Sequence, residues 1–210
     1  MTHDALLAGA TGLIGREIAR QWPGPGTLHR LVRRGSGQAH EIVVDFGALP
    51  ALPAADIALC ALGTTIGVAG SQAAFRAVDF DAVLAYAQAA RAAGVRCFAA
   101  VSSLGAQPRS SNFYSRVKGE AEEALVQLGF ESLLLARPSL LMGDRAALGQ
   151  PLRRGEHIGA AVAGVLGPLI PAAWRPIEAA MVARALIRTA AERRPGVQRL
   201  SSAQLQVLGR

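Results

Sequence analysis

Tyr114 and Lys118 form the most specific chemical pattern in the sequence. They stand four residues apart within residues 113–128, whose pattern predicts a helix, so both side chains lie on one helix face. Lys118 is the only lysine of the 210-residue chain, and Tyr114 is one of its 2 tyrosines. Because a neighbouring ammonium group favours the ionised form of a phenol, Tyr114 is predicted to exchange a proton with a carbonyl oxygen.

Two serines are expected close to this pair. Ser102 and Ser103 directly follow residues 95–101, an apolar run that predicts a buried strand. Ligands of open parallel sheets bind beyond the carboxyl ends of the strands, so these hydroxyls fall where chemistry is expected. Ser103, or else Ser102, is predicted to hydrogen-bond the oxygen that Tyr114 protonates. The alternative is that both serines simply end the strand as polar residues.

A glycine-rich loop near the N-terminus predicts where a dinucleotide sits. An apolar run over residues 4–8 predicts a buried strand, and a helical pattern over residues 13–22 follows. Between them, Gly9 would permit a tight turn, Gly12 the close approach of a pyrophosphate, and Gly15 close packing of helix on sheet. The phosphates would meet the unpaired N–H groups of the helix N-terminus. The alternative is a glycine-rich surface turn.

The ends of the next strands favour NADPH over NADH. Residues 27–32 predict a second strand, which ends in Arg33 and Arg34 without an acidic residue. Arginine at that place accommodates a 2′-phosphate, whereas an acidic residue would bind the 2′-hydroxyl. Paired arginines are also ordinary on a protein surface. Asp45, which ends a third strand over residues 41–45, either accepts a hydrogen bond from the adenine amino group or caps a loop.

The fourth predicted strand leads into another loop of small residues. Residues 56–62 form this apolar run, and Gly63 and Thr64 follow it. A small residue there would again let the backbone approach the cofactor closely. Gly67 and Gly70 prolong the loop, which predicts mobility near the site.

The alternation of strands and helices predicts an α/β fold, a doubly wound parallel sheet of the Rossmann type with a small C-terminal elaboration. The 210 residues, 51% of them hydrophobic, suit one domain with a large core. We therefore expect a single domain over residues 1–210, of which about residues 146–210 form the substrate side. The uncharged residues 158–173 predict a packed helix and loop, or else a docking surface. Further predicted elements are helices over 75–93 and 177–191 and strands over 130–136 and 197–200.

Composition argues against several other classes of protein. The formal net charge is +7, but the arginines are spread along the chain rather than gathered in a stripe with aromatic residues, so nucleic-acid binding is not expected. Cys60 and Cys97 fall in predicted buried strands, and no Cys/His cluster has the spacing of metal ligands. The uncharged stretch is short for a membrane span, so no transmembrane segment is expected. The first residues carry no positively charged leader, which predicts a cytoplasmic protein. A homodimer or a protein partner stays open.

Five further stretches extend the pattern and are listed in chain order: Leu62-Gly63-Thr64-Thr65, Val101-Ser102-Ser103-Leu104-Gly105-Ala106, Ser110-Ser111-Asn112-Phe113-Tyr114, Val117-Lys118-Gly119-Glu120 and Arg137-Pro138. Together with the glycine loop and the double arginine, they resemble the atypical short-chain dehydrogenases/reductases. More narrowly, the chain is similar to the Tat-interacting-protein-like group of NADPH-binding Rossmann proteins and its bacterial relatives. The likeness covers nearly the whole chain.

This resemblance implies an NADP(H) site. The implied contacts are Thr11, Gly12, Leu13 and Ile14 to the phosphates, Arg33 and Arg34 to the 2′-phosphate, Leu62 and Gly63 to the adenosine half, and Tyr114, Lys118 and Leu141 to the nicotinamide. The sequence departs from the family after Asp144-Arg145, where Ala146-Ala147-Leu148-Gly149 stands in place of further arginines and acidic residues. Arg145 or Arg153 would then supply a late arginine contact.

Two functions are consistent with these features. The set of Ser103, Tyr114 and Lys118 predicts an NADPH-dependent oxidoreductase that reduces a carbonyl group of a small, largely apolar substrate. In this hypothesis Lys118 also binds hydroxyls of the nicotinamide ribose. The alternative is a protein that senses NADPH and regulates a partner without metabolic turnover, for which the uncharged residues 158–173 would be the docking surface.

Overall fold

A seven-stranded sheet forms the centre of the computed structural model, which describes residues 4–23, 26–143 and 171–210. All seven strands are parallel, in the order β3-β2-β1-β4-β5-β6-β9. They are β1 (Ala5–Ala8), β2 (Leu28–Val32), β3 (Glu41–Val43), β4 (Ile57–Cys60), β5 (Cys97–Val101), β6 (Ser132–Arg137) and β9 (Gly196–Ser201). Two short parallel strands, β7 (Leu141–Met142) and β8 (Ile177–Glu178), form a separate pair.

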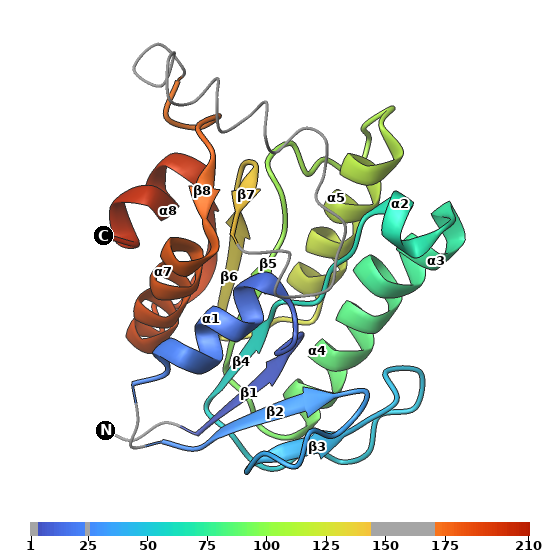
Figure 1. Cartoon of the computed structure of the whole chain (residues 1–210), viewed down its shortest axis with the longest axis vertical. Coiled ribbons are helices and arrows are strands. Elements are labelled where there is room, and N and C mark those ends of the chain that lie inside the picture. Colours follow the sequence, from blue (N-terminus) through green and yellow to red (C-terminus); the bar gives the residue numbers. More distant parts are fainter. Residues whose placement is uncertain (1–3, 24–25, 144–170) are drawn as a thin grey trace.

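Helices cover both faces of this sheet (Figure 1). On one side lie α1, α7 and α8, and on the other α4 and α5. The helices are α1 (Leu13–Gln21), α2 (Ile66–Ala69), α3 (Gln72–Arg76), α4 (Ala82–Ala92), α5 (Phe113–Gln127), α7 (Ala179–Glu192) and α8 (Ser202–Leu208), with a π-helical turn η1 (Ala77–Asp81) between α3 and α4. The predicted doubly wound Rossmann-type fold is confirmed.

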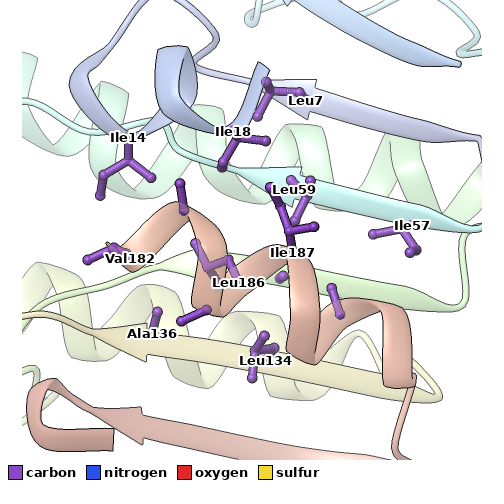
Figure 2. Close-up of a cluster of buried hydrophobic side chains, with 14 of the residues drawn as sticks. Leu7, Ile14, Ile18, Ile57, Leu59, Leu134, Ala136, Val182, Leu186 and Ile187 are labelled. Carbon is purple, nitrogen blue, oxygen red and sulfur yellow. The ribbon is translucent and has the colours of Figure 1, made fainter. Parts of the chain in front are cut away.

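The central strands are apolar because both of their faces are covered. Every residue of β1 and of β4 is buried, as is typical of parallel strands between two helical layers. Figure 2 shows the core on the side of α1 and α7, where Ile18 and Leu186 pack against Leu7 and Leu59 of the sheet. Burying a side chain of this size contributes about 1.5–3 kcal/mol, so this layer holds the start of α1 firmly on the sheet.

Two predicted elements differ from the structure in a way that bears on the site. The single helix expected over residues 75–93 is a longer helical segment, α3 to α4, interrupted by η1. The loop expected to continue through Gly67 and Gly70 is instead the helical turn α2, which Thr65 caps by accepting a hydrogen bond from the Val68 N–H. Gly70 ends this turn with φ of 84°, a conformation that glycine adopts without strain.

The C-terminal residues contribute to the main layers. Strand β9 pairs with β6 along residues 196–201, and α7 packs on α1. The expectation for residues 158–173 lies almost entirely outside the described residues. Within the described ranges 4–23, 26–143 and 171–210, no helix has the length and apolar character needed to cross a membrane.

Candidate active site

A cavity of about 510 Å³ opens at the carboxyl ends of β1, β4, β5 and β6. The order of the strands reverses between β1 and β4, and such a switch point is where open α/β sheets bind ligands. The residues that line the cavity are Gly12, Leu13, Ile14, Ala61, Leu62, Gly63, Thr64, Thr65, Val68, Asp79, Val101, Ser102, Ser103, Leu104, Tyr114, Lys118, Pro138, Ser139, Leu140, Leu141 and Trp174.

The glycine loop forms one wall of this cavity through close backbone contacts. Gly9 has φ of +83°, and a Cβ atom there would lie 2.5 Å from the carbonyl carbon of Ala61. A Cβ atom on Gly15 would lie 2.0 Å from the Gly9 carbonyl oxygen. Both glycines are therefore required by packing, and neither lines the cavity itself. Gly12 does line it, as the predicted phosphate contacts Leu13 and Ile14 also do.

In the described part of the chain, no side chain caps the N-terminus of α1. Gly12 is its N-cap, so no side chain caps the first turn, and that turn contains no acidic residue. Unpaired N–H groups and the positive end of the helix dipole attract phosphate at such a place. The neighbouring Thr11 is exposed and lies outside the cavity lining.

Lys118 and Asp79 form a buried ion pair in the cavity wall. Lys118 Nζ lies 2.8 Å from Asp79 Oδ1, and the two side chains are only 7% and 0% exposed. Asp79 Oδ2 accepts a hydrogen bond from the Thr64 N–H at 2.8 Å. One carboxylate thus connects η1 to α5 and to the loop after β4.

The charge of Lys118 depends on this neighbour. Burial alone would lower the pKa of Lys118, but the Asp79 carboxylate, together with Tyr114, outweighs burial and holds that pKa above its usual value. Burial raises the pKa of the nearby Cys60 thiol to about 12, so this cysteine is a neutral thiol at neutral pH.

Tyr114 lies one helical turn before Lys118, as the four-residue spacing predicts. Its ring packs on that of Phe75, with 5.2 Å between the ring centroids, and this contact fixes the side chain beside the cavity. The position of α5 is set by Gly119, where a Cβ atom would lie 2.2 Å from the backbone nitrogen of Pro108. Helix α5 therefore packs directly on the loop that follows Ser103.

The two serines that follow β5 present unpaired hydroxyl groups to the cavity. Ser102 and Ser103 are each 8% exposed, and their Oγ atoms are buried without a hydrogen-bond partner in the described part of the chain. The Ser102 N–H continues the sheet by donating to the Ala136 carbonyl at 2.7 Å. Buried hydroxyls without partners are costly, so these two are well placed to bind a polar group of a ligand.

Besides Gly9, Thr11 and Gly15, three more predicted cofactor residues are not part of the cavity lining, and Arg145 is not described. Arg33 and Arg34 follow β2, are exposed, and have no hydrogen-bond or ion-pair partner among the described residues. Asp45 is also exposed, and its Oδ1 accepts a hydrogen bond from the Gly47 N–H at 2.8 Å, so it caps a loop, the alternative considered for it. Arg145 lies outside the described residues. By contrast, Leu62, Gly63, Thr64 and Leu141 line the cavity.

Asp79 is the site residue that the sequence interpretation missed. Its signal was an acidic residue inside an apolar helical stretch, on the same face as Val83 and Tyr86, both of which are buried. A carboxylate on the buried face of a helix needs a cationic or hydrogen-bonding partner, and Lys118 is the one lysine of the chain. In the described part of the chain, no group of three or more His, Cys, Asp or Glu side chains is arranged to hold a metal ion.

Comparison with known proteins identifies relatives of the chain. The fmp52 protein of Emericella nidulans, described as mitochondrial, is 40% identical over 115 residues, which are 55% of this chain and 48% of that protein. The chain thus matches about half the length of that relative. HTATIP2 of Rattus norvegicus is 32% identical over 185 residues, 81% of this chain and 77% of that protein. No family model matches the chain.

Solved structures with the same fold carry nicotinamide cofactors. MoeE5 in complex with UDP-glucose and NAD has a TM-score of 0.71 at 19% identity, over 94% of this chain and 76% of that one. The human epimerase family protein SDR39U1 with NADPH has a TM-score of 0.68 at 17% identity, over 99% and 80% of the two chains. At these identities the likeness shows the fold alone.

The fold defines the class of this protein as a Rossmann-type α/β protein with a doubly wound parallel sheet. Within that class, the chain belongs to the family of FMP52 and HTATIP2. The cytoplasmic location predicted from the N-terminal residues is wrong by this comparison, because several fungal relatives are named as mitochondrial proteins. Location is decided by targeting signals, and the absence of a positively charged leader among the first residues was not enough to predict it.

Proposed function

We propose that the chain is an NADPH-dependent carbonyl reductase that acts on a small, largely apolar substrate. The observation that carries the proposal is that Tyr114, Lys118 and the unpaired Ser103 hydroxyl line one cavity, which also contains the uncapped start of α1. A volume of about 510 Å³ lies in the range of ordinary small-molecule sites. Two solved structures of the same fold contain NAD or NADPH, which supports a nicotinamide cofactor for this fold.

The residues present fit a nicotinamide dinucleotide phosphate. The N–H groups at Leu13 and Ile14, in the first turn of α1, would hold the pyrophosphate, and Gly63 would let the backbone pass close to the cofactor. Arg33 and Arg34, whose guanidinium groups have no partner among the described residues, would bind a 2′-phosphate. When bound, this cofactor supplies the hydride for the reduction.

The chain's own residues would handle the proton and the developing charge. The Tyr114 hydroxyl donates its proton to the substrate carbonyl oxygen, acting as a general acid. The Ser103 hydroxyl, with Ser102 beside it, donates a hydrogen bond to the same oxygen and stabilises negative charge there. The Lys118 ammonium group, held in the cavity wall, favours the anion that Tyr114 becomes after giving up its proton.

The walls of the cavity favour a substrate without charge. Its outer part is apolar, with Val68, Leu140 and Trp174 exposed by 57%, 38% and 66%. The charged residues among those described in the lining are Asp79 and Lys118, which neutralise one another. An anionic substrate would find no unpaired cation among these residues, whereas an apolar aldehyde or ketone would bury its chain against the outer side chains.

Replacement of Tyr114 by phenylalanine tests this proposal. In a screen of aliphatic and aromatic aldehydes and ketones, we expect Tyr114→Phe to lower turnover of NADPH by about 100-fold or more, because the proton donor is lost. Affinity for NADPH, measured by fluorescence, should stay within about twofold of wild type, since the ring remains.

Tyr86→Phe provides the matched control. Tyr86 is fully buried in the core, and its hydroxyl has no hydrogen-bond partner among the described residues. Removal of this hydroxyl should leave turnover unchanged. Wild-type turnover in Tyr114→Phe, or no turnover by the wild-type protein with any carbonyl of the screen, would count against the proposed reaction.

A further inference from the structure

We propose that Asp79 is a positioning residue of this site: it holds the Lys118 ammonium group in the cavity wall and fixes the Gly63–Thr64 loop beside it. The inference rests on the proposed cofactor site, because a fixed ammonium group affects function only if a ligand binds next to it. It concerns a residue that acts through Lys118 and the loop.

The geometry at Asp79 joins three elements at one point. Its Oδ1 lies 2.8 Å from Lys118 Nζ on α5, and its Oδ2 accepts the Thr64 N–H at 2.8 Å from the loop after β4. A hypothetical Cβ on Gly63 would lie 3.4 Å from Asp79 Oδ1 and 3.7 Å from Lys118 Nζ. Loop, carboxylate and ammonium are therefore in contact, and a shift of one must move the others.

The local backbone explains how an acidic residue reaches this place. Asp79 lies in the middle of η1, where the helix widens to a π-helical turn, and the residue is 1% exposed. Single π-helical turns within α-helices recur at functional sites, because the extra residue redirects a side chain. The next acidic residue, Asp81, ends the same turn and is exposed.

Without Asp79, the charge on Lys118 would be unfavourable. An isolated buried ammonium group loses its hydration and tends to give up its proton. The titratable groups that act on Lys118 are Asp79 from η1, Tyr114 from its own helix and Cys60 from β4. Asp79 is the carboxylate among them, and burial keeps Cys60 a neutral thiol, with a pKa of about 12.

The pair also leaves donor capacity for a ligand. An ammonium group has three N–H donors. One points to Asp79, and a second makes a long contact of 3.5 Å with the Val101 carbonyl oxygen. Because Lys118 lines the cavity, the donor that remains is available to an oxygen bound there, such as a hydroxyl of the cofactor ribose.

The single lysine of the chain permits a direct test. Labelling with carbon-13 lysine gives one side-chain signal in an NMR spectrum, and that signal reports the protonation of Lys118. In the wild-type protein we expect Lys118 to stay charged past its ordinary pKa of 10.5. In Asp79→Asn, a nearly isosteric change, burial remains and the carboxylate is gone, so the pKa should fall below 10.5. Asp81→Asn should titrate as wild type.

Binding of NADPH to the same three proteins provides the functional readout. We expect Asp79→Asn to weaken NADPH binding by about tenfold, the loss of one charge-assisted hydrogen bond, and Asp81→Asn to leave it unchanged. If wild type and Asp81→Asn bind NADPH but Asp79→Asn binds equally well, the positioning role is overturned and the cofactor site stands. If none of the three binds, both fail. Should Asp79→Asn not fold, the wild-type titration decides, because loss of the Lys118 proton below pH 10.5 contradicts the role.

Discussion

Glu122 is a second buried carboxylate, and it joins helix α5 to two strands of the sheet. It is 3% exposed, and its two oxygens accept hydrogen bonds from Arg137 Nε at 2.9 Å and Nη2 at 2.6 Å. Arg199 Nε lies 3.6 Å from the same carboxylate. Helix α5 is thereby joined to the ends of β6 and β9, just before Pro138 and the lining residues that follow it.

We expect Glu122→Gln to lower the free energy of unfolding by about 2 kcal/mol, because the arginines lose a buried anionic partner. The loss should be smaller than for a fully buried pair, since the Arg137 side chain is 31% exposed. Urea denaturation measures the difference. Glu123→Gln, an exposed neighbour on α5, should change stability by less than about 0.5 kcal/mol. Equal free energies of unfolding for the two variants would show that the Glu122 carboxylate does not stabilise the fold in this way.

Residue patterns in the sequence identified the polar side chains at the centre of the candidate site but not the buried carboxylates that hold the surrounding elements in place. The helix period brings Tyr114 and Lys118 to one face, and the strand-end rule brings Ser102 and Ser103 to the same cavity. Their catalytic roles stay predictions. Asp79 was missed although an acidic residue in an apolar helical stretch pointed to it. The π-helical turn that contains it has no signal of its own in the local residue types. Glu122 was not predicted because its partners, Arg137 and Arg199, come from strands that are distant in sequence.

At the scale of elements, two glycines of the loop have different roles. Gly15 is required by packing, whereas Gly12 is proposed to lie next to the cofactor. Gly12 has extended backbone geometry, with φ of −81°, and a Cβ atom there would have its nearest contact at 3.4 Å, the Gly9 carbonyl oxygen. The fold therefore tolerates a methyl group at Gly12. At Gly15 the same methyl group would lie 2.0 Å from the Gly9 carbonyl oxygen, which the fold cannot accept without moving α1.

Gly12→Ala and Gly15→Ala should therefore fail in different ways. We expect Gly12→Ala to be folded, with a stability loss below about 1 kcal/mol, but to bind NADPH at least tenfold more weakly, because the methyl group occupies the place of the phosphates. Gly15→Ala should lower the thermal midpoint strongly or prevent folding. Calorimetry and fluorescence titration separate the two effects. Unchanged NADPH affinity in Gly12→Ala would contradict the assignment of this loop.

Strands with a simple apolar pattern were predicted well, whereas a short helix started by a side-chain cap was not. Apolar runs gave β1 and β4 because a strand buried on both faces leaves a simple pattern. The loop through Gly67 and Gly70 was expected to be irregular, but Thr65 caps a short helix there. Glycine content alone suggested a loop, whereas a hydroxyl acceptor at the right position starts a helical turn.

At the scale of the molecule, the sheet and its helical layers place the residues that line the cavity at one edge of the sheet. The reversal of strand order between β1 and β4 creates the crevice, and strands β5 and β6 extend it to the serines and to the segment after Arg137. The alternation of elements was enough to predict this doubly wound fold. The division of the chain into a cofactor part and a substrate side at about residue 146 stays a proposal.

The most direct test of this account is a fluorescence titration with NADPH and, separately, NADH. We expect micromolar binding of NADPH and at least tenfold weaker binding of NADH, since the exposed guanidinium groups of Arg33 and Arg34 would hold the 2′-phosphate. The double variant Arg33→Ala/Arg34→Ala should lose this preference. Arg96→Ala/Arg194→Ala, which removes the same charge from exposed residues before β5 and β9, should keep it. If neither nucleotide binds the wild-type protein, or if both double variants keep the same preference for NADPH, the proposed site is contradicted.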